Sequence, residues 1–110
     1  MGRFVKGDVV VVPFPFSDLS TAKKRPALVV TALRGDDVIL CQITSKAVAD
    51  HCAIPLSDAD FGSGGLRQDS HARPNRLFTA DSRIILYRAG SLAAVKVLEI
   101  VDRIVEIIRS

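Results

Sequence analysis

The apolar residues of this chain fall into short β-branched and aromatic runs, and only the last twenty residues carry a helical pattern. Such runs predict strands over 8–16, 26–33 and 38–45. From Leu92 to Ile108, apolar residues instead recur every three or four positions. This spacing predicts a helix that begins near Ser91, a residue type suited to the N-cap. The chain is therefore predicted to be mainly β with one C-terminal helix.

Residues that interrupt strands separate these runs. Pro13 and Pro15 lack the backbone N–H that a sheet ladder needs, so the first strand must end, bulge or lie at an edge there. The segment Arg34–Asp37 contains Gly35 and predicts a turn that joins the second and third strands in a hairpin. Further along we predict a short strand over 53–56, a glycine-rich loop over 61–65, an irregular strand over 66–79 and a last strand over 83–88 that Gly90 ends.

Five or more short strands followed by one helix are typical of a small β-barrel with a packed terminal helix. The chain has 110 residues, 48% of them hydrophobic, which suffices for one core, so residues 1–110 are predicted to form a single domain. Part of this apolar material is expected to be buried against a second chain. No apolar run is long enough to span a membrane and no signal peptide is visible, so we expect a cytoplasmic protein without membrane contact.

The net charge of +3 is mildly basic and compatible with a nucleic-acid ligand. Six of the 15 Lys and Arg residues lie in the segments 23–25 and 67–76. Cys41 and Cys52 show no metal-ligand spacing, and His51 and His71 have no ligand partner at a suitable distance along the chain, so we predict neither metal nor cofactor. The two cysteines form either one disulfide or, as we favour, two apolar thiols in a reducing compartment.

The sequence contains no phosphate-binding glycine loop and no nucleophile elbow. Arg25 stands where a polar loop over 17–25 meets the second strand, and Thr44 ends the third. In the predicted hairpin, residue 25 lies opposite roughly residue 45, so Arg25 and Thr44 converge at the end of the barrel away from the turn. A guanidinium and a hydroxyl placed there can bind a phosphodiester. The alternative, an ion-paired surface arginine and a threonine that favours β structure, stays open.

The run GDVVVVPFPFSDLSTAKKRPALVV, from Gly7 to Val30, resembles the opening of the MazF/PemK (Kid-like) family of toxin ribonucleases. Gln42–Ser45 is similar to the second motif of that family, and Gly65–Ser70 with Leu77–Thr79 to the third. The resemblance covers nearly the whole chain, with the motifs in the family's order and spacing. It implies an SH3-like small β-barrel of the Kid/CcdB type with a C-terminal helix.

The resemblance also implies a function, that of the toxin of a type II toxin–antitoxin system. Such a toxin is a homodimer that inhibits growth by cutting single-stranded mRNA at a short sequence without metal, and a cognate antitoxin inhibits it. The products would carry 2′,3′-cyclic phosphate and 5′-OH ends. The family's catalytic residues fall on Arg25, which would stabilise the phosphorane, and Thr44, which would bind a phosphate oxygen. RNA contacts are expected from Lys23, Lys24, Ser45, Ser70, Arg73 and Arg76, and the general base is left unassigned.

The segment 73–76 and Phe78 differ from the better-known members of that family, so the resemblance implies no particular cleavage sequence. Arg73 and Arg76 either contact RNA or are solvated surface residues. Two other functions remain as alternatives. One is a non-catalytic or gyrase-directed binding module on the same barrel, and the other is a toxin remnant that retains only antitoxin binding.

Overall fold

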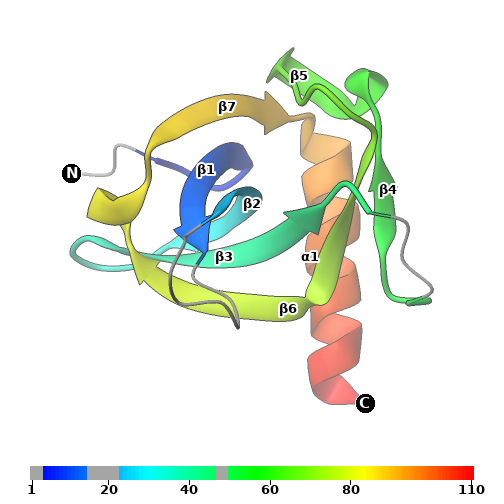
Figure 1. Ribbon diagram of the computed structural model, residues 1–110. Coiled ribbons are helices and arrows are strands. Elements are labelled where there is room, and N and C mark those ends of the chain that lie inside the picture. Colours follow the sequence, from blue (N-terminus) through cyan, green and yellow to red (C-terminus); the bar gives the residue numbers. More distant parts are fainter. Residues whose placement is uncertain (1–3, 15–22, 47–49) are drawn as a thin grey trace.

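The structure is a computed structural model that describes residues 4–14, 23–46 and 50–110. In this part of the chain, seven antiparallel strands form one curled sheet in the order β4-β6-β3-β2-β1-β7-β5. In Figure 1, β7 arches above β1 to β3 and β6 runs below them, with α1 at the right-hand end. The elements are β1 (Asp8–Phe14), β2 (Lys23–Ala32), β3 (Asp37–Thr44), β4 (Ile54–Leu56), η1 (Asp58–Asp60), β5 (Phe61–Gly64), β6 (Ser70–Asp81), η2 (Ser82–Ile84), β7 (Tyr87–Leu92) and α1 (Ala94–Arg109).

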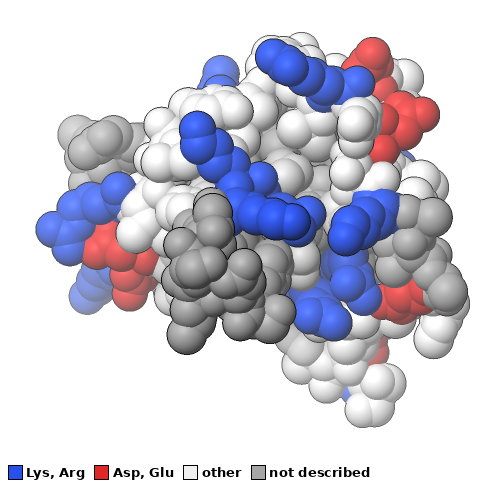
Figure 2. All heavy atoms as spheres, viewed as in Figure 1, with Lys and Arg blue, Asp and Glu red and all other residues white. Residues whose placement is uncertain are grey.

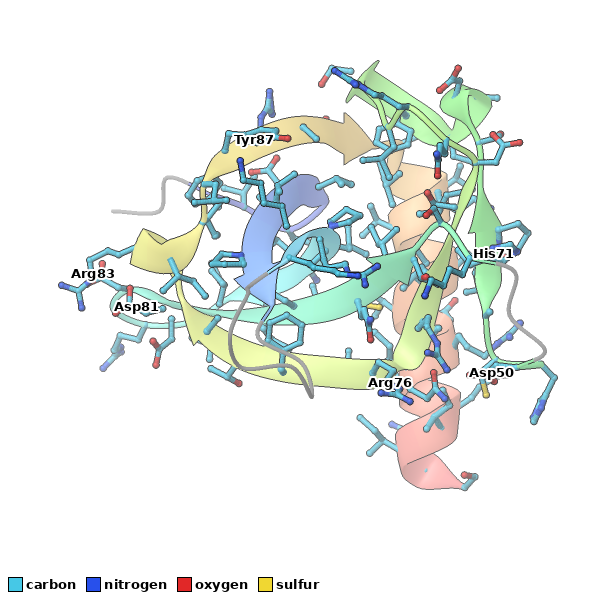
Figure 3. All side chains as sticks on the ribbon, viewed as in Figure 1. Asp50, His71, Arg76, Asp81, Arg83 and Tyr87 are labelled. Atoms are coloured by element: carbon cyan, nitrogen blue, oxygen red, sulfur yellow. The ribbon has the colours of Figure 1, made fainter. Side chains whose placement is uncertain are left out.

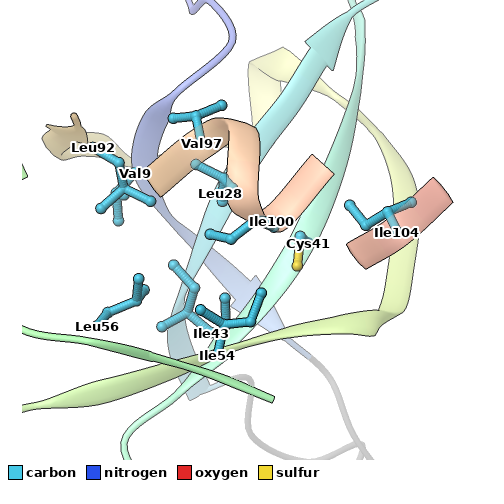
Figure 4. Close-up of a cluster of buried hydrophobic side chains, with 11 residues drawn as sticks. Val9, Leu28, Cys41, Ile43, Ile54, Leu56, Leu92, Val97, Ile100 and Ile104 are labelled. Carbon is cyan, nitrogen blue, oxygen red and sulfur yellow. The ribbon is translucent and has the colours of Figure 1, made fainter. Parts of the chain in front are cut away.

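The central strands β1, β2 and β3 are buried on both faces. Successive residues of a strand point to opposite faces, and the neighbours Val9 and Val10 both have no exposed surface. Val9 belongs to a cluster that α1 covers with Val97, Ile100 and Ile104 (Figure 4). Val10 belongs to a second cluster on the other face of the sheet. Double-sided burial explains why the first apolar run is continuous rather than alternating.

The hairpin predicted from the turn at 34–37 is confirmed, because β2 pairs antiparallel with β3 and Gly35 adopts a φ of +83°. Pro13 lies in β1 opposite Lys24 of β2, beyond the last residue of β1 that pairs with β7. It therefore stands where only one side of the strand is paired, as a proline requires. Residues 17–22 of the predicted loop over 17–25 lie outside the described residues. Residues 23–25 of that predicted loop belong to β2.

The prediction of a glycine-rich loop over 61–65 is wrong, because Phe61–Gly64 forms strand β5 and pairs with β7. Gly64 and Gly90 are opposed in this pairing. A Cβ at Gly90 would collide with the backbone oxygen of Ser63, and one at Gly64 with that of Ala89. The glycines thus serve a close approach of two strands, and Gly90 lies buried within β7 rather than at a strand end.

The boundaries of the last two elements also differ from the prediction. Residues 82–84 form a short 3-10 helix, and the strand expected over 83–88 begins only at Tyr87. Ser91 is not the N-cap of the helix, because it lies in β7, where its hydroxyl is 3.0 Å from that of Ser63. Helix α1 follows Ala93, which provides no side-chain cap. No helix in the described ranges has the length and apolar character needed to cross a membrane.

We predict that Leu28→Ala lowers the free energy of unfolding by about 2–5 kcal/mol, because Leu28 has no exposed surface and its truncation leaves a cavity. Leu33→Ala is the matched control, since Leu33 is 41% exposed just after the same strand. Urea denaturation of both variants measures the difference. Equal losses in the two variants would contradict the placement of the core.

Candidate functional site

A hollow of about 270 Å³ lies where β2 begins and β3 ends, next to the loop that precedes β6. It brings together four of the residues predicted from the sequence to bind or act on a ligand. Its lining consists of Lys24, Arg25 and Pro26 from β2, Ile43 and Ser45 from the end of β3, and Leu66, Arg67, Gln68 and Ser70 from the loop and the start of β6.

Arg25 and Thr44 lie at matching ends of adjacent strands. Ala27 pairs with Gln42, and the same register continued by two residues brings Arg25 opposite Thr44. Opposed residues of an antiparallel pair point to the same face. Arg25 is half-buried, whereas Thr44 is buried and its hydroxyl accepts a hydrogen bond of 3.2 Å from the backbone N–H of Lys46. The two side chains thus stand at the end of the barrel away from the 34–37 turn.

The surface around this end is basic. Lys23, Lys24, Ser45 and Lys46 are exposed at the strand ends. Figure 2 shows Lys and Arg side chains across the middle of the face that carries β3 and β6 in Figure 1, with Asp and Glu toward its margins. Such a concentration of positive charge favours an anionic ligand. Ser70 is buried at the rim, and its hydroxyl donates to the backbone oxygen of Gln68 at 3.0 Å.

Arg73 lies apart from the hollow and is paired with Asp50. The Nη2 atom of Arg73 is 3.3 Å from Oδ2 of Asp50, and the amide of Asn75 donates to the same oxygen at 2.7 Å. The other oxygen of Asp50 accepts the backbone N–H of Cys52 at 2.8 Å. These interactions, that of Cys52 first, lower the pKa of the Asp50 carboxyl to about 2. The Asp50 carboxylate therefore neutralises much of the positive charge that Arg73 would otherwise present to a ligand.

The position of Arg73 follows from an irregularity in β6. Ile43 pairs with Ala72 but Cys41 pairs with Leu77, so the segment 73–76 faces Gln42 alone. Pro74 cannot donate to the ladder, which accounts for the bulge. Arg76 is exposed on the outer edge of this bulge, in the lower part of Figure 3. The irregular strand predicted over 66–79 is confirmed from residue 70 onward, because β6 spans Ser70–Asp81 and residues 66–69 belong to the preceding loop.

Among the described residues, Asp50, His51 and Cys52 offer potential metal-ligand atoms that lie within 4.8 Å of one another. Asp50 is already bound by Arg73. Arg103 points its Nη1 atom at the backbone oxygens of His51 and Cys52, each at 3.4 Å. Two guanidinium groups thus flank the trio, and their charge disfavours a cation there.

Both cysteines are free thiols, so the disulfide alternative is wrong. Cys41 is buried, and its Sγ lies 3.2 Å from the backbone oxygen of Arg73. Burial raises the pKa of the Cys41 thiol to about 12, which leaves it protonated and unreactive at neutral pH. Cys52 is half-buried.

Three residues near the hollow were not among the predicted site residues. Arg67 lines it, and the density of basic residues in 67–76 was the one signal that pointed toward it. Gln68 lines it as well, without any signal in the sequence. His71 lies on β6 directly opposite Thr44. Its proximity to Thr44 depends on the β3–β6 pairing, which no local pattern reveals.

We predict that Asp50→Asn destabilises the protein at neutral pH, because the substitution removes the negative charge that faces Arg73. A carboxyl whose pKa is lowered by folding stabilises the folded state above its ordinary pKa of about 3.9 and loses this effect as the pH falls toward its folded value. The stability gap between wild type and Asp50→Asn should therefore shrink between pH 4 and about 2. Thermal unfolding across this range tests it, with Asp102→Asn on the exposed side of α1 as control. A gap that does not change with pH would contradict the ion pair.

A sequence profile of the PemK-like, MazF-like toxins of type II toxin–antitoxin systems matches residues 5–108. No curated protein sequence matches the chain significantly.

Several solved structures share the fold. MazF from Deinococcus radiodurans superposes with a TM-score of 0.77 at 16% identity and covers 100% of both chains. The Mycobacterium tuberculosis toxin MazF-mt6 gives a TM-score of 0.68 at 20% identity over 90% of this chain and 93% of its own. A mycobacterial endoribonuclease, solved in complex with its cognate antitoxin, gives a TM-score of 0.74 at 11% identity over 94% and 93%.

These likenesses confirm the predicted fold class, a curled β-barrel with one C-terminal helix. The profile match spans nearly the whole chain and shows family membership, which structural likeness at such low identity does not show. The chain belongs to the PemK-like, MazF-like toxin family of type II toxin–antitoxin systems.

Proposed function

We propose that this toxin is an endoribonuclease that cuts single-stranded mRNA, without a metal ion, at the hollow where β2 begins and β3 ends. The observation that carries the proposal is the alignment of Arg25 with Thr44 beside a basic hollow. Family membership supports it, and so do related folds that are endoribonucleases.

Arg25, which lines the hollow, and the adjacent Thr44, which does not, suit phosphodiester cleavage. In this reaction the 2′ oxygen attacks phosphorus and the bond to the 5′ oxygen breaks, which leaves 2′,3′-cyclic phosphate and 5′-OH ends. Negative charge grows on the phosphorane, and a fixed guanidinium stabilises it. Arg25 supplies this cation, and the Thr44 hydroxyl donates to a phosphate oxygen once it binds RNA.

The remaining residues around the hollow bind the substrate. Lys23, Lys24 and Arg67 attract the RNA backbone, and Ser45 and Ser70 offer hydroxyls to phosphate or sugar. Arg76 extends the basic surface along β6. Arg73 reaches RNA only by exchanging Asp50 for a phosphate, which makes it a weaker contributor than its charge suggests. Bases of a single strand are splayed out and read by their edges in such sites.

We predict that Arg25→Ala lowers the cleavage rate of a long single-stranded RNA by about 10²–10³-fold, because the phosphorane loses its cation. The assay contains EDTA and compares Arg83→Ala, a surface arginine paired with Asp81 at the far side of the barrel (Figure 3). Arg83→Ala should cleave as the wild type does. Undiminished cleavage by Arg25→Ala would remove that residue from the site, and loss of wild-type cleavage in EDTA would refute metal independence.

In cells, expression should inhibit growth and deplete mRNA. Growth arrest with intact mRNA and damaged DNA would instead favour the gyrase-directed alternative. A further partner is a cognate antitoxin that covers the hollow, as expected of a family whose members are toxins of toxin–antitoxin systems. Its binding should protect RNA from cleavage.

We also propose that the toxin is a homodimer whose subunits meet along α1. Val95, Leu98, Val105 and Ile108 of this helix are 76%, 59%, 39% and 71% exposed. They are spaced symmetrically about the middle of the helix. A two-fold axis at that point therefore opposes Val95 with Ile108 of the second copy and Leu98 with Val105, which is the self-complementarity that a symmetric dimer needs.

Light scattering at micromolar concentration should therefore give twice the chain mass of 11.9 kDa. Leu98→Asp should shift the mass toward the monomer, because it places a charge in the apolar contact. Ile84→Asp is the control, since Ile84 is 42% exposed on η2, away from α1. A monomeric wild type, or a dimer unaffected by Leu98→Asp, would contradict this arrangement.

A further inference from the structure

His71 lies on the same face of the sheet as Thr44. Thr44 pairs with His71 across β3 and β6, and Pro55 of β4 pairs with His71 on the other side. Their neighbours Ile43 and Ile54 both pair with Ala72, and all three belong to the cluster that α1 covers. Because alternate residues point to opposite faces, the imidazole and the Thr44 hydroxyl both point away from that cluster. Figure 3 shows His71 beside β4, at the same end of β6 as the end of β3.

The three residues Arg25, Thr44 and His71 thus form a row across β2, β3 and β6. Adjacent strands are about 4.8 Å apart. A phosphate held at Thr44 therefore has a guanidinium one strand away on one side and an imidazole one strand away on the other. An in-line displacement has the attacking and leaving oxygens on opposite sides of phosphorus, so a base on one side of the phosphate and a cation on the other suit it.

The imidazole also has an unused hydrogen-bonding atom. Nδ1 of His71 is buried and has no hydrogen-bond partner in the described part of the chain, although the ring as a whole is half-buried. Native proteins satisfy most buried polar groups, and exceptions recur at functional positions. No hydrogen bond in the described ranges thus accounts for this ring atom of His71.

The hollow adjoins the row at Arg25, whereas Thr44 and His71 do not line it, and its lining leaves one chemical role unfilled. Its polar groups are Lys24, Arg25, Arg67, Gln68, Ser45 and Ser70, and none of these accepts a proton readily at neutral pH. The carboxylate of Asp50, which does not line the hollow, is held by Arg73 and Asn75, and its pKa of about 2 makes it a weak base. Histidine is the side chain best suited to proton transfer near neutral pH.

We propose that His71 is the general base of the cleavage reaction, an inference that rests on the proposed ribonuclease function. The neutral imidazole takes the proton of the 2′-hydroxyl while the 2′ oxygen forms its bond to phosphorus. The bond from phosphorus to the 5′ oxygen breaks, and that oxygen leaves with the electron pair and takes a proton from water. The resulting hydroxide removes the proton from the imidazolium, which restores His71.

The test compares His71→Ala with His51→Ala in cleavage of a single-stranded RNA. His51 is exposed outside the row and is the matched control, since the chain has two histidines. We expect His71→Ala to lose about 10²–10⁴-fold in rate and His51→Ala to match the wild type. Added imidazole should restore part of the lost rate, because it can enter the space of the missing ring. Affinity for RNA with a 2′-deoxy sugar at the cut position should stay unchanged.

Each outcome is decisive. If His71→Ala cleaves like the wild type while Arg25→Ala is inactive, the proposed role of His71 is wrong. The ribonuclease function is then still supported. Loss of both cleavage and RNA binding, without recovery in imidazole, assigns His71 to substrate binding and also overturns its role as the general base. A wild type that leaves RNA intact refutes the ribonuclease function itself. His71→Gln, which keeps a polar side chain of similar length, repeats the test if thermal unfolding shows that His71→Ala is poorly folded.

Discussion

Burial of β1, β2 and β3 on both faces is the constraint on which the rest of the structure depends. One apolar cluster binds α1 to the sheet, and the other packs the opposite face of these strands against Phe4, Phe78, Ala80 and Ile85. Neither cluster can be completed without these strands in one fixed register, because a shift by one residue would exchange the two faces. The register in turn fixes which side chains meet where the strands emerge from the core. Arg25 and Thr44 are positioned by packing that they do not themselves provide.

The same constraint determines what was predictable. Long β-branched runs and a helical period are local signals, so the central strands, the hairpin and α1 were found from them. The hairpin also placed Arg25 near Thr44, because a two-strand register needs only a turn. His71 was found only in the structure, since its position depends on β6 pairing with β3 from about thirty residues away. For Arg67 the only signal was the density of basic residues in 67–76. Whether Arg25 and Thr44 act on RNA remains a proposal based on family and geometry.

Wrong predictions have similar physical causes. Gly64 and Gly90 were interpreted as signs of a loop and of a strand end, whereas they permit β5 and β7 to approach closely. Ser91 has the right chemistry for an N-cap, but its hydroxyl lies against Ser63 in the neighbouring strand. Arg73 has the charge of a ligand contact, but Asp50, 23 residues earlier, holds it. In each case a contact with a residue distant along the chain, rather than the local preference of the residue itself, determined the structure.

The glycine contact between β5 and β7 has a consequence for how this toxin can diversify. The N–H of Gly65 donates to the backbone oxygen of Ala89 at 3.2 Å, so a main-chain hydrogen bond holds the point from which the loop toward β6 starts. Arg67 and Gln68 follow that point and line the hollow. Their side chains take no part in securing the loop's origin. If the proposed ribonuclease function holds, selection can therefore replace them, and with them the RNA sequences that are recognised, while the barrel and the row of Arg25, Thr44 and His71 keep their geometry.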